Sequence, residues 1–298
     1  MKILLLGMNG QVGWELQRSL APLGELVALD FDSPGPLVAD FARPEALAAT
    51  VRAVAPQVIV NAAAHTAVDK AEAEPELART INATAPGSLA REAASLGAWL
   101  VHYSTDYVFD GSGTLPWRED SPTGPLSVYG STKLEGEQAI RASGCQHLIL
   151  RTSWVYAARG GNFARTMLRL AAERERLSVI EDQIGAPTGA ELLADVTAHT
   201  LRSAMAKPGL GGTYHVAAAG ETSWHGYARH VIEFARSAGQ PVRVRPEDIS
   251  PIGTSAYPTP ARRPQNSRLD THKLKQTFGL ALPDWRTGVE RMLREVLG

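Results

Sequence analysis

The first turn of the chain limits its fold more than any other segment does. The apolar run Lys2–Leu6 has the pattern of a buried strand, and Gln11–Ala21 has the pattern of a helix. The turn between them reads Gly7-x-x-Gly10-x-x-Gly13, a spacing that differs from the more common G-x-G-x-x-G. Glycines in this context allow a tight turn and let a phosphate approach the backbone at the helix N-terminus. We therefore expect these three glycines to hold the diphosphate of a dinucleotide, although a glycine-rich turn without a ligand has the same pattern.

The rest of the first half alternates short apolar runs with helical patterns. We expect strands at Glu25–Asp30, Gln57–Asn61, Trp99–Ser104 and His147–Arg151, and helices at Pro44–Val54, Pro75–Leu96 and Tyr129–Ala142. Continuous apolar strands that alternate with helices indicate a parallel sheet covered on both faces. The expected fold class is therefore α/β, a Rossmann-like doubly wound parallel sheet with a smaller C-terminal α/β substrate-binding lobe.

The second half is organised differently. Helices are expected at Asn162–Arg174, Glu191–Ala206, Trp224–Ala238 and Thr287–Leu297, and Pro- and Gly-rich segments such as Ile249–Pro264 separate them. We place a nucleotide-binding domain at residues 1–155 and a mainly substrate-binding lobe at residues 156–298. Some elements of the second half are expected to return to the first domain.

Composition and charge exclude several classes of function. The chain has 298 residues and a net charge of −1, so it offers no basic field for nucleic acid. Its apolar runs are too short to cross a bilayer, and the first of them ends at the glycine turn without the features of a signal peptide. The single cysteine, Cys145, excludes an intrachain disulfide. We expect a cytoplasmic protein that binds neither nucleic acid nor membrane.

Residues after the first two expected strands are suited to a dinucleotide. The amide groups of Gln11 and Val12 would face its phosphates at the helix N-terminus. Asp30 ends the second strand, where a carboxylate can accept hydrogen bonds from ribose hydroxyls and would repel a 2′-phosphate. This favours NADH over NADPH without excluding NADPH, and a surface turn residue is the alternative for Asp30.

Two further segments are candidates for the same cofactor. Asp40 could hold an adenine by a hydrogen bond and Phe41 by packing. The run Ala62-Ala63-Ala64 is small and lies at the carboxyl end of a strand, which leaves room for the cofactor beside Ala63 and Ala64. For both segments a purely structural role stays open.

The spacing Tyr129-x-x-x-Lys133 suggests the chemistry. A carbonyl that accepts a hydride develops negative charge on its oxygen and needs a proton donor within hydrogen-bond reach. Tyr129 can donate this proton, and Lys133, one turn further on the same helix face, would lower the pKa of the phenol and bind the nicotinamide ribose. Thr105 or Ser104, at the end of the preceding strand, can donate a hydrogen bond to the substrate oxygen. The pattern indicates hydride transfer at a carbonyl or alcohol carbon, although a surface pair on a helix has the same spacing.

A resemblance to a known family extends through nearly the whole chain. The segments that carry it are Gly7–Glu15, Asn61–Ala71, His102–Phe109, Tyr129–Lys133, Arg151–Tyr156, Gly185–Asp195 and Tyr257–Arg268. On these the chain resembles the extended short-chain dehydrogenase/reductases, and among them the dTDP-4-dehydrorhamnose reductases. The resemblance implies reduction of the C4 ketone of a dTDP-sugar, dTDP-4-dehydro-β-L-rhamnose, by NADH or NADPH.

The resemblance also implies roles for individual residues. Cofactor positions of the family match Gly10, Gln11, Val12, Asp30, Asp40, Phe41, Ala64, His65, Thr66, Tyr103, Tyr129 and Lys133. Its sugar-nucleotide positions match Thr105, Asp106 and Trp154, with Tyr129 as the proton donor and Thr105 in the usual place of a serine. Family members form homodimers with Mg²⁺ held by interface glutamates, and the matching positions are Glu15, Glu191 and, less clearly, Glu295.

Some of these residues could serve the fold instead of a ligand. His65 could stabilise a corner of the fold, and Trp154 could belong to the core between the two lobes. Arg262 is our candidate for the substrate diphosphate, because arginine pairs well with phosphates, but one of the adjacent residues Arg262 and Arg263 could simply face water. Solvated helix charges are the alternative to a metal at Glu15 and Glu191.

Three rival functions can be weighed. A sugar-nucleotide dehydratase of this fold carries Asp-Glu after the threonine, whereas Asp106 is followed here by Tyr107. An epimerase of the GDP-fucose type needs a cysteine near the sugar, and Cys145 is badly placed for that role. A non-catalytic subunit, like the regulatory β subunit of methionine adenosyltransferase, stays open, although Tyr129, Lys133 and Thr105 are all present.

Overall fold

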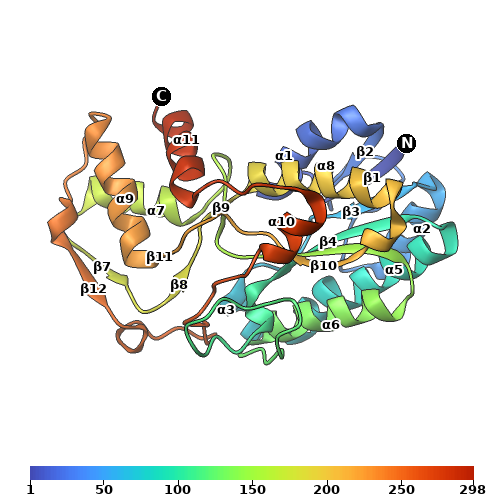
Figure 1. Ribbon diagram of the computed structural model, residues 1–298, viewed down its shortest axis with the longest axis horizontal. Helices are drawn as coiled ribbons and strands as arrows, with labels where there is room; N and C mark the ends of the chain where they lie inside the picture. The colour runs from blue at the N-terminus through green and yellow to red at the C-terminus, as the bar shows by residue number, and fades with distance from the viewer.

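A computed structural model describes all 298 residues. A six-stranded parallel sheet forms one half of the molecule (Figure 1). The strand order is β10 (Gly212–His215), β5 (Gln146–Thr152), β4 (Trp99–Thr105), β3 (Val58–Asn61), β1 (Lys2–Leu6) and β2 (Glu25–Leu29). Because β1 pairs with both β2 and β3, the chain reverses its direction across the sheet beside β1. Doubly wound sheets bind ligands in the crevice beyond the carboxyl ends of two such strands. The expected fold class is confirmed.

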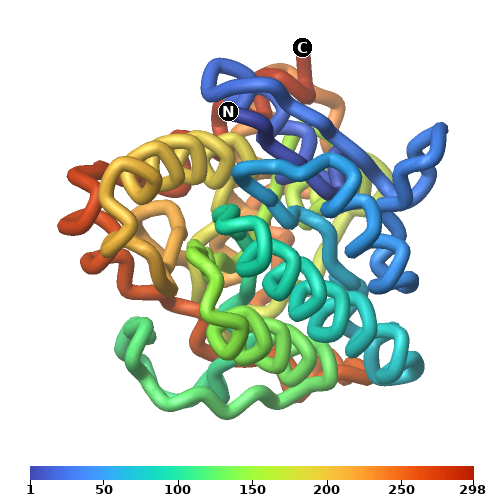
Figure 2. Tube along the Cα trace, turned by 90° about the vertical axis from the view of Figure 1, so that its right-hand side faces the viewer, coloured from blue at the N-terminus to red at the C-terminus, as the bar shows by residue number.

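Helices cover both faces of this sheet because its buried strands are apolar on both sides. In β1, Ile3 and Leu5 belong to one core cluster, and Leu4 and Leu6 to another. The first cluster is covered by α1 (Gln11–Leu20), α8 (Ala190–Ala206) and α10 (His272–Phe278). The second is covered by α2 (Pro44–Val54), α5 (Ala85–Leu96) and α6 (Val128–Ala142). Figure 2 shows α5 and α6 running side by side.

The other half of the molecule has a core of its own. It contains α7 (Phe163–Glu173), α9 (Trp224–Ser237), α11 (Trp285–Leu297), and the parallel pair β7 (Leu177–Ile180) and β12 (Ile249–Ile252). Short pairs β6 (Val155–Tyr156) with β9 (Thr188–Gly189), and β8 (Ile184–Gly185) with β11 (Thr222–Ser223), lie between this core and the sheet (Figure 1). Single 3₁₀ turns are η1 (Ala21–Leu23), η3 (Asp106–Val108), η4 (Pro208–Leu210), η5 (Pro246–Asp248) and η6 (Thr254–Ala256). The division at residue 155 stays a prediction, and α8 and β10 from the second half lie on and in the sheet.

The expected helix Pro75–Leu96 is confirmed at both ends, but it contains a π-helical turn. The structure has α3 (Val68–Ala73), α4 (Pro75–Arg79), a π-helical turn η2 (Thr80–Thr84) and then α5. The π turn places the Asn82 carbonyl against α6, where a Cβ on Gly136 would lie 2.2 Å from it. The Asn82 side chain accepts a hydrogen bond from the His65 amide at 2.9 Å and donates one to the His65 carbonyl at 3.1 Å. Such turns interrupt helices near functional sites, and local periodicity does not reveal them.

Two further elements differ from the expected pattern. The strand β12 lies inside the Pro-rich segment Ile249–Pro264, whose composition predicts irregular structure, and α10 follows that segment.

None of the helices is both long and apolar enough to cross a membrane.

Candidate active site

The glycine turn lies at the point beside β1 where the chain reverses its direction across the sheet. The structure shows why glycine is needed at Gly7 and Gly13. Gly7 adopts φ +86°, and a Cβ there would lie 2.8 Å from the amide nitrogen of Ala63. A Cβ on Gly13 would lie 1.9 Å from the Gly7 carbonyl oxygen. Gly10 precedes α1 and leaves that helix without a side-chain cap. The loops after β1 and β3 therefore touch, and the N-terminus of α1 is open to an anion.

Asp30 lies against this turn. Its carboxylate accepts hydrogen bonds from the amides of Asn9 at 2.9 Å and Phe31 at 2.8 Å. The carboxylate is thus held beside the glycine turn at the end of β2, where a ribose of a dinucleotide would lie. An uncapped helix N-terminus and an adjacent carboxylate fit a nicotinamide dinucleotide.

The other expected cofactor residues lie along the same edge but in different environments. Asp40 accepts a hydrogen bond from the Ala42 amide at 2.9 Å. The ring of Phe41 is 5 % exposed and belongs to the core, so its packing serves the fold, and contact with an adenine stays a prediction. The backbone of His65 is tied to η2, while its Nδ1 atom is buried without a partner. Thr66 is exposed in the loop after β3.

The start of α6 brings Tyr129 to the end of β4. The Ser127 hydroxyl caps the helix by accepting a hydrogen bond from the Gly130 amide at 3.2 Å. A Cβ on Gly130 would lie 2.3 Å from the carbonyl oxygen of Tyr107, so the helix packs directly on the turn η3. The rings of Tyr107 and Tyr129 meet edge to face with centroids 5.4 Å apart. The Thr105 hydroxyl lies beside the Tyr129 phenol, and its effect taken alone lowers the pKa of that phenol.

Asp106 is buried in the same corner. Thr105 Oγ1 donates a hydrogen bond to Asp106 Oδ1 at 3.1 Å, and Asp106 Oδ2 has no partner. Burial raises the pKa of Asp106 to about 6, although the nearby hydroxyls of Ser267 and Thr105 favour the carboxylate. The expected substrate residues Thr105 and Asp106 therefore adjoin the phenol of Tyr129.

The expected action of Lys133 on Tyr129 is not what the structure shows. Burial, together with the Asp106 carboxylate, raises the pKa of Tyr129 to about 12. Lys133 Nζ instead donates to the carbonyl of Tyr103 at 2.6 Å and lies 3.3 Å from Nε2 of His102. Burial lowers the pKa of Lys133 to about 8, against the opposing effect of Glu137. The lysine is thus directed toward β4 and not toward the phenol.

Sequence reasoning missed the residues behind Lys133. His102 and Asn61 are both 1 % exposed, and neither was a candidate. The only available signal was that polar residues interrupt two otherwise apolar strands. The expected cofactor residue Tyr103 contributes its carbonyl to Lys133, while its phenol lies 2.5 Å from Thr197 Oγ1 on α8.

An aromatic stack faces the site from the second half of the chain. Trp154 has φ +49°, a strained conformation for a bulky residue of the kind that clusters at functional sites. Its indole stacks on Trp224 with centroids 3.6 Å apart, and a Cβ on Gly185 would lie 2.8 Å from it. Next to this stack is a cavity of about 620 Å³ whose walls come from both halves, including Tyr107 and Trp224.

Arg263, and not Arg262, lines this cavity. Arg263 forms two hydrogen bonds to the carboxylate of Asp69, at 2.7 and 2.8 Å, whereas Arg262 is exposed and lies outside the cavity wall. Alternation along the extended segment turns only one of the two side chains inward. Our choice of Arg262 for the substrate diphosphate is therefore not supported.

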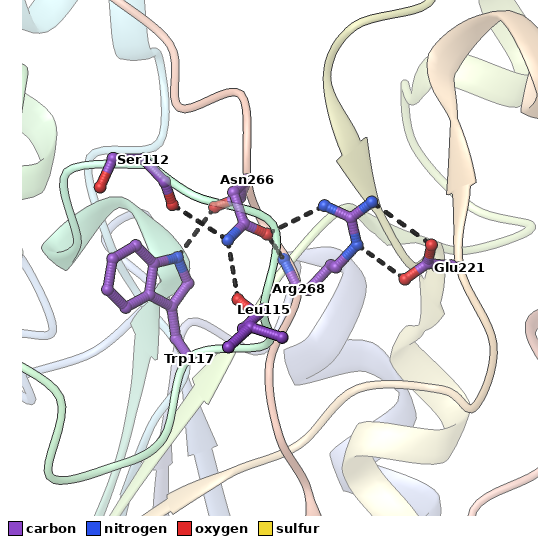
Figure 3. A network of polar contacts seen from close by, with 6 residues as sticks. All are labelled: Ser112, Leu115, Trp117, Glu221, Asn266 and Arg268. Atoms are coloured by element: carbon purple, nitrogen blue, oxygen red, sulfur yellow. Dashed lines mark hydrogen bonds and ion pairs between the residues drawn. The ribbon is translucent and has the colours of Figure 1, made fainter.

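The same segment connects the two halves, as Figure 3 shows. The Asn266 carboxamide donates to the carbonyls of Ser112 and Leu115, at 3.2 and 2.8 Å, and the Trp117 indole donates to the Asn266 carbonyl at 3.0 Å. Arg268 pairs with Glu221 at 2.7 Å. These bonds fix the loop after β4 to the segment around Asn266.

The glutamates expected to hold a metal are paired with arginines. Glu191 lies 3.5 Å from Arg291, and Glu15 lies 3.6 Å from Arg18. Burial raises the pKa of Glu191, and the carboxylates of Glu15 and Glu295 add to this effect while Arg291 opposes it. No group of three or more His, Cys, Asp or Glu side chains is placed to bind a metal ion within the chain. A magnesium ion shared between two chains stays a prediction.

Comparison with known proteins agrees with this geometry. Residues 1–297 match the family described as RmlD substrate binding domain. The chain belongs to this family. It is 59 % identical over 296 residues to dTDP-4-dehydrorhamnose reductase of Escherichia coli K12, covering 99 % of this chain and 98 % of that one.

Solved structures give the same result. A dTDP-4-dehydrorhamnose reductase of Clostridium acetobutylicum superposes with a TM-score of 0.89 at 36 % identity, over 100 % of both chains. The corresponding protein of Bacillus anthracis, in complex with NADP, superposes with a TM-score of 0.86 at 34 % identity over 99 % of both chains. The resemblance inferred from the motifs is confirmed.

Proposed function

We propose that the protein is a dTDP-4-dehydrorhamnose reductase, which reduces the C4 ketone of dTDP-4-dehydro-β-L-rhamnose with NADH or NADPH. The observation that carries the proposal is the convergence of three elements at one edge of the sheet. These are the open glycine turn after β1, the Thr105–Asp106 pair after β4, and Tyr129 at the start of α6. Family membership over the full length of the chain supports the choice of substrate.

Each residue in this corner has a definite task in the proposed reaction. The cofactor supplies the hydride. Tyr129 delivers the proton to the C4 oxygen, and its high pKa keeps the phenol protonated at neutral pH. Thr105 donates a hydrogen bond to the same oxygen or to the phenolate that forms. Lys133, whose amino group is within the same buried region, would provide a hydrogen bond for the ribose, and positive charge when it takes its ammonium form there.

The cavity between the halves is where we place the sugar nucleotide. Trp154 and Trp224 offer an aromatic wall for the sugar or base, and Arg263 offers a cation to the diphosphate. Asp30 favours NADH, and the Bacillus anthracis relative in complex with NADP supports keeping NADPH in the proposal. We include a homodimer, with or without Mg²⁺, in the proposal.

The test is oxidation of NADH and NADPH, followed at 340 nm, with enzymatically generated dTDP-4-dehydro-L-rhamnose. We expect turnover to dTDP-L-rhamnose. Tyr129→Phe should lower kcat by about 10²- to 10⁴-fold with little change in NADH affinity, because only the proton donor is lost. Tyr214→Phe, a matched control on β10 whose phenol bonds the Leu210 carbonyl, should keep its activity.

Two results would overturn the proposal. If the wild-type protein binds cofactor but does not turn over, the sugar assignment fails, and other 4-ketosugar nucleotides and the non-catalytic subunit become the hypotheses to test. If Tyr129→Phe retains a near-normal kcat, the proton comes from another group.

A further inference from the structure

Behind the catalytic corner lies a closed cluster of three polar side chains. Lys133 is 2 % exposed, and His102 and Asn61 are each 1 % exposed. They come from α6, β4 and β3, and lie among apolar residues of the sheet core. In such a setting each donor has to meet an acceptor, since an unpaired buried polar group costs free energy.

The direction of the hydrogen bonds in this cluster can be read from one backbone amide. The amide of Ala63 can only donate, and it lies 3.0 Å from Asn61 Oδ1. This fixes the orientation of the carboxamide, so that Asn61 Nδ2 donates to His102 Nδ1 at 3.0 Å. His102 is neutral, because burial holds its pKa well below the ordinary value. A neutral imidazole that accepts at Nδ1 carries its proton on Nε2.

His102 therefore points an N–H group at Lys133. The Nε2 and Nζ atoms are 3.3 Å apart, and Nζ also donates to the Tyr103 carbonyl at 2.6 Å. An ammonium group has three donors and no acceptor, whereas an amine has a lone pair that can accept from Nε2. The geometry thus suits the amine form of Lys133 and opposes the ammonium form.

We propose that Asn61 and His102 are positioning residues, which favour the amine form of Lys133 by presenting it with a hydrogen-bond donor. The effect on turnover rests on the proposed function, in which Lys133 serves Tyr129 and the cofactor ribose. A lysine poised in this way can gain or lose a proton near neutral pH, while an ordinary lysine stays charged. It would take the ammonium form when its amino group leaves β4 for an acceptor in the site.

Other charged groups face Lys133 but do not set this direction. Glu137, one turn further along α6, favours the ammonium form, and its carboxylate is already bound by Arg151 from β5 at 2.7 and 2.8 Å. On the side of the cleft, Asp106 faces Tyr129. Neither group contacts the Asn61–His102 pair, so the direction of the hydrogen bonds through this pair can be reversed without changing Glu137 or Asp106.

The test reverses the direction of the hydrogen bonds that run from Asn61 through His102 to Lys133. In Asn61→Asp, both carboxylate oxygens accept, so the His102 proton moves to Nδ1 and Nε2 becomes an acceptor for the Lys133 ammonium. We expect the pKa of Lys133 to rise by about one to three units, the effect of an opposite charge on a buried group. His102→Gln is the matched control without a new charge, because its amide oxygen would accept from Asn61 Nδ2 and its amide nitrogen would still donate toward Nζ, so this pKa should stay close to that of the wild type.

Lysine titration by NMR gives a readout that is independent of turnover. The chain has only six lysines, Lys2, Lys70, Lys133, Lys207, Lys273 and Lys275, so ¹³Cε-labelled lysine yields few signals. Lys133→Met assigns the signal of interest. In wild type that signal should titrate well below the other five; Asn61→Asp should move it upward, and His102→Gln should leave it near its wild-type position.

Turnover and a control complete the experiment. In Asn61→Asp the alkaline limb of kcat should move to higher pH by the same amount as the NMR titration. His215→Gln replaces a buried histidine on β10 that bonds the Trp117 carbonyl, and it should leave the Lys133 signal unchanged even if stability falls. A wild-type Lys133 that titrates with the other lysines, or one that Asn61→Asp does not shift, would overturn the inference. Absence of turnover with a normal NMR result would instead reject the proposed function.

Discussion

Replacing Asp106 with asparagine measures how far the buried Asp106 carboxylate of the candidate site lowers the free energy of unfolding. Asp106 is 2 % exposed, and its Oδ2 atom has no hydrogen-bond partner. Burial raises the pKa of this carboxyl from 3.8 to about 6, because the hydroxyls of Thr105 and Ser267 only partly replace water. The ionised carboxylate should therefore destabilise the protein, as residues kept for function often do.

The pH dependence of this cost follows from the raised pKa. Below pH 3.8 the Asp106 carboxyl is protonated in both the folded and the unfolded chain, and no ionisation cost is present. As the pH rises toward 6, the unfolded chain loses its proton first, so the free energy of unfolding falls; above about pH 6 the full cost is present. A shift of about two units corresponds to roughly 3 kcal/mol, of which about 1.4 kcal/mol develops between pH 5 and pH 7.5.

Urea denaturation of wild type and Asp106→Asn at several pH values tests this reasoning. The free energy of unfolding of the variant, relative to wild type, should rise by about 1.4 kcal/mol from pH 5 to pH 7.5. Asp110→Asn is the control, because the exposed Asp110 carboxyl has a lowered pKa through its hydrogen bonds with Ser112, so its removal should cost more stability as pH rises. A difference between Asp106→Asn and wild type that is constant with pH, or that grows toward acid pH, would refute the argument.

Three other substitutions test the fold and the cofactor turn. Gly13→Ala should lower stability by about 1–3 kcal/mol and remove NADH binding in calorimetry, because its Cβ would lie 1.9 Å from the Gly7 carbonyl; unchanged affinity would contradict this. Glu137→Gln should cost about 3–5 kcal/mol in urea denaturation, since it leaves the buried Arg151 without its partner charge. Ala55→Gly should raise the free energy of unfolding by about 1 kcal/mol in the same assay, because Ala55 ends α2 in the left-handed region with φ +45°. A lower free energy of unfolding would show that the turn is not strained.

The sheet half of the fold could be predicted from local patterns. Buried parallel strands such as Lys2–Leu6 are apolar on both faces, and helices such as Gln11–Leu20 carry one apolar stripe, so both are visible in short windows. The helix expected at Pro75–Leu96 contains a π-helical turn where Gly136 brings α6 against Asn82, a contact between segments far apart in the chain. No local period records such a contact.

The candidate site could be predicted only where its motifs are contiguous. The spacing of Tyr129 and Lys133 on one helix, and the position of Thr105 at a strand end, follow from the sequence. The choice between Arg262 and Arg263, and the stacking of Trp154 on a tryptophan from α9, depend on which way each backbone turns in three dimensions. The roles of these residues stay predictions until the variants are measured.

The sequence by itself determined strands β1 to β5 with the main helices between them, the glycine turn before α1, and the family resemblance. Only the tertiary structure decided the environment of the reactive groups. It raised the pKa of Tyr129, lowered that of Lys133, and set the hydrogen-bond direction through His102. The physical reason is that backbone conformation follows from neighbours in the chain, whereas desolvation and hydrogen-bond direction follow from neighbours in space.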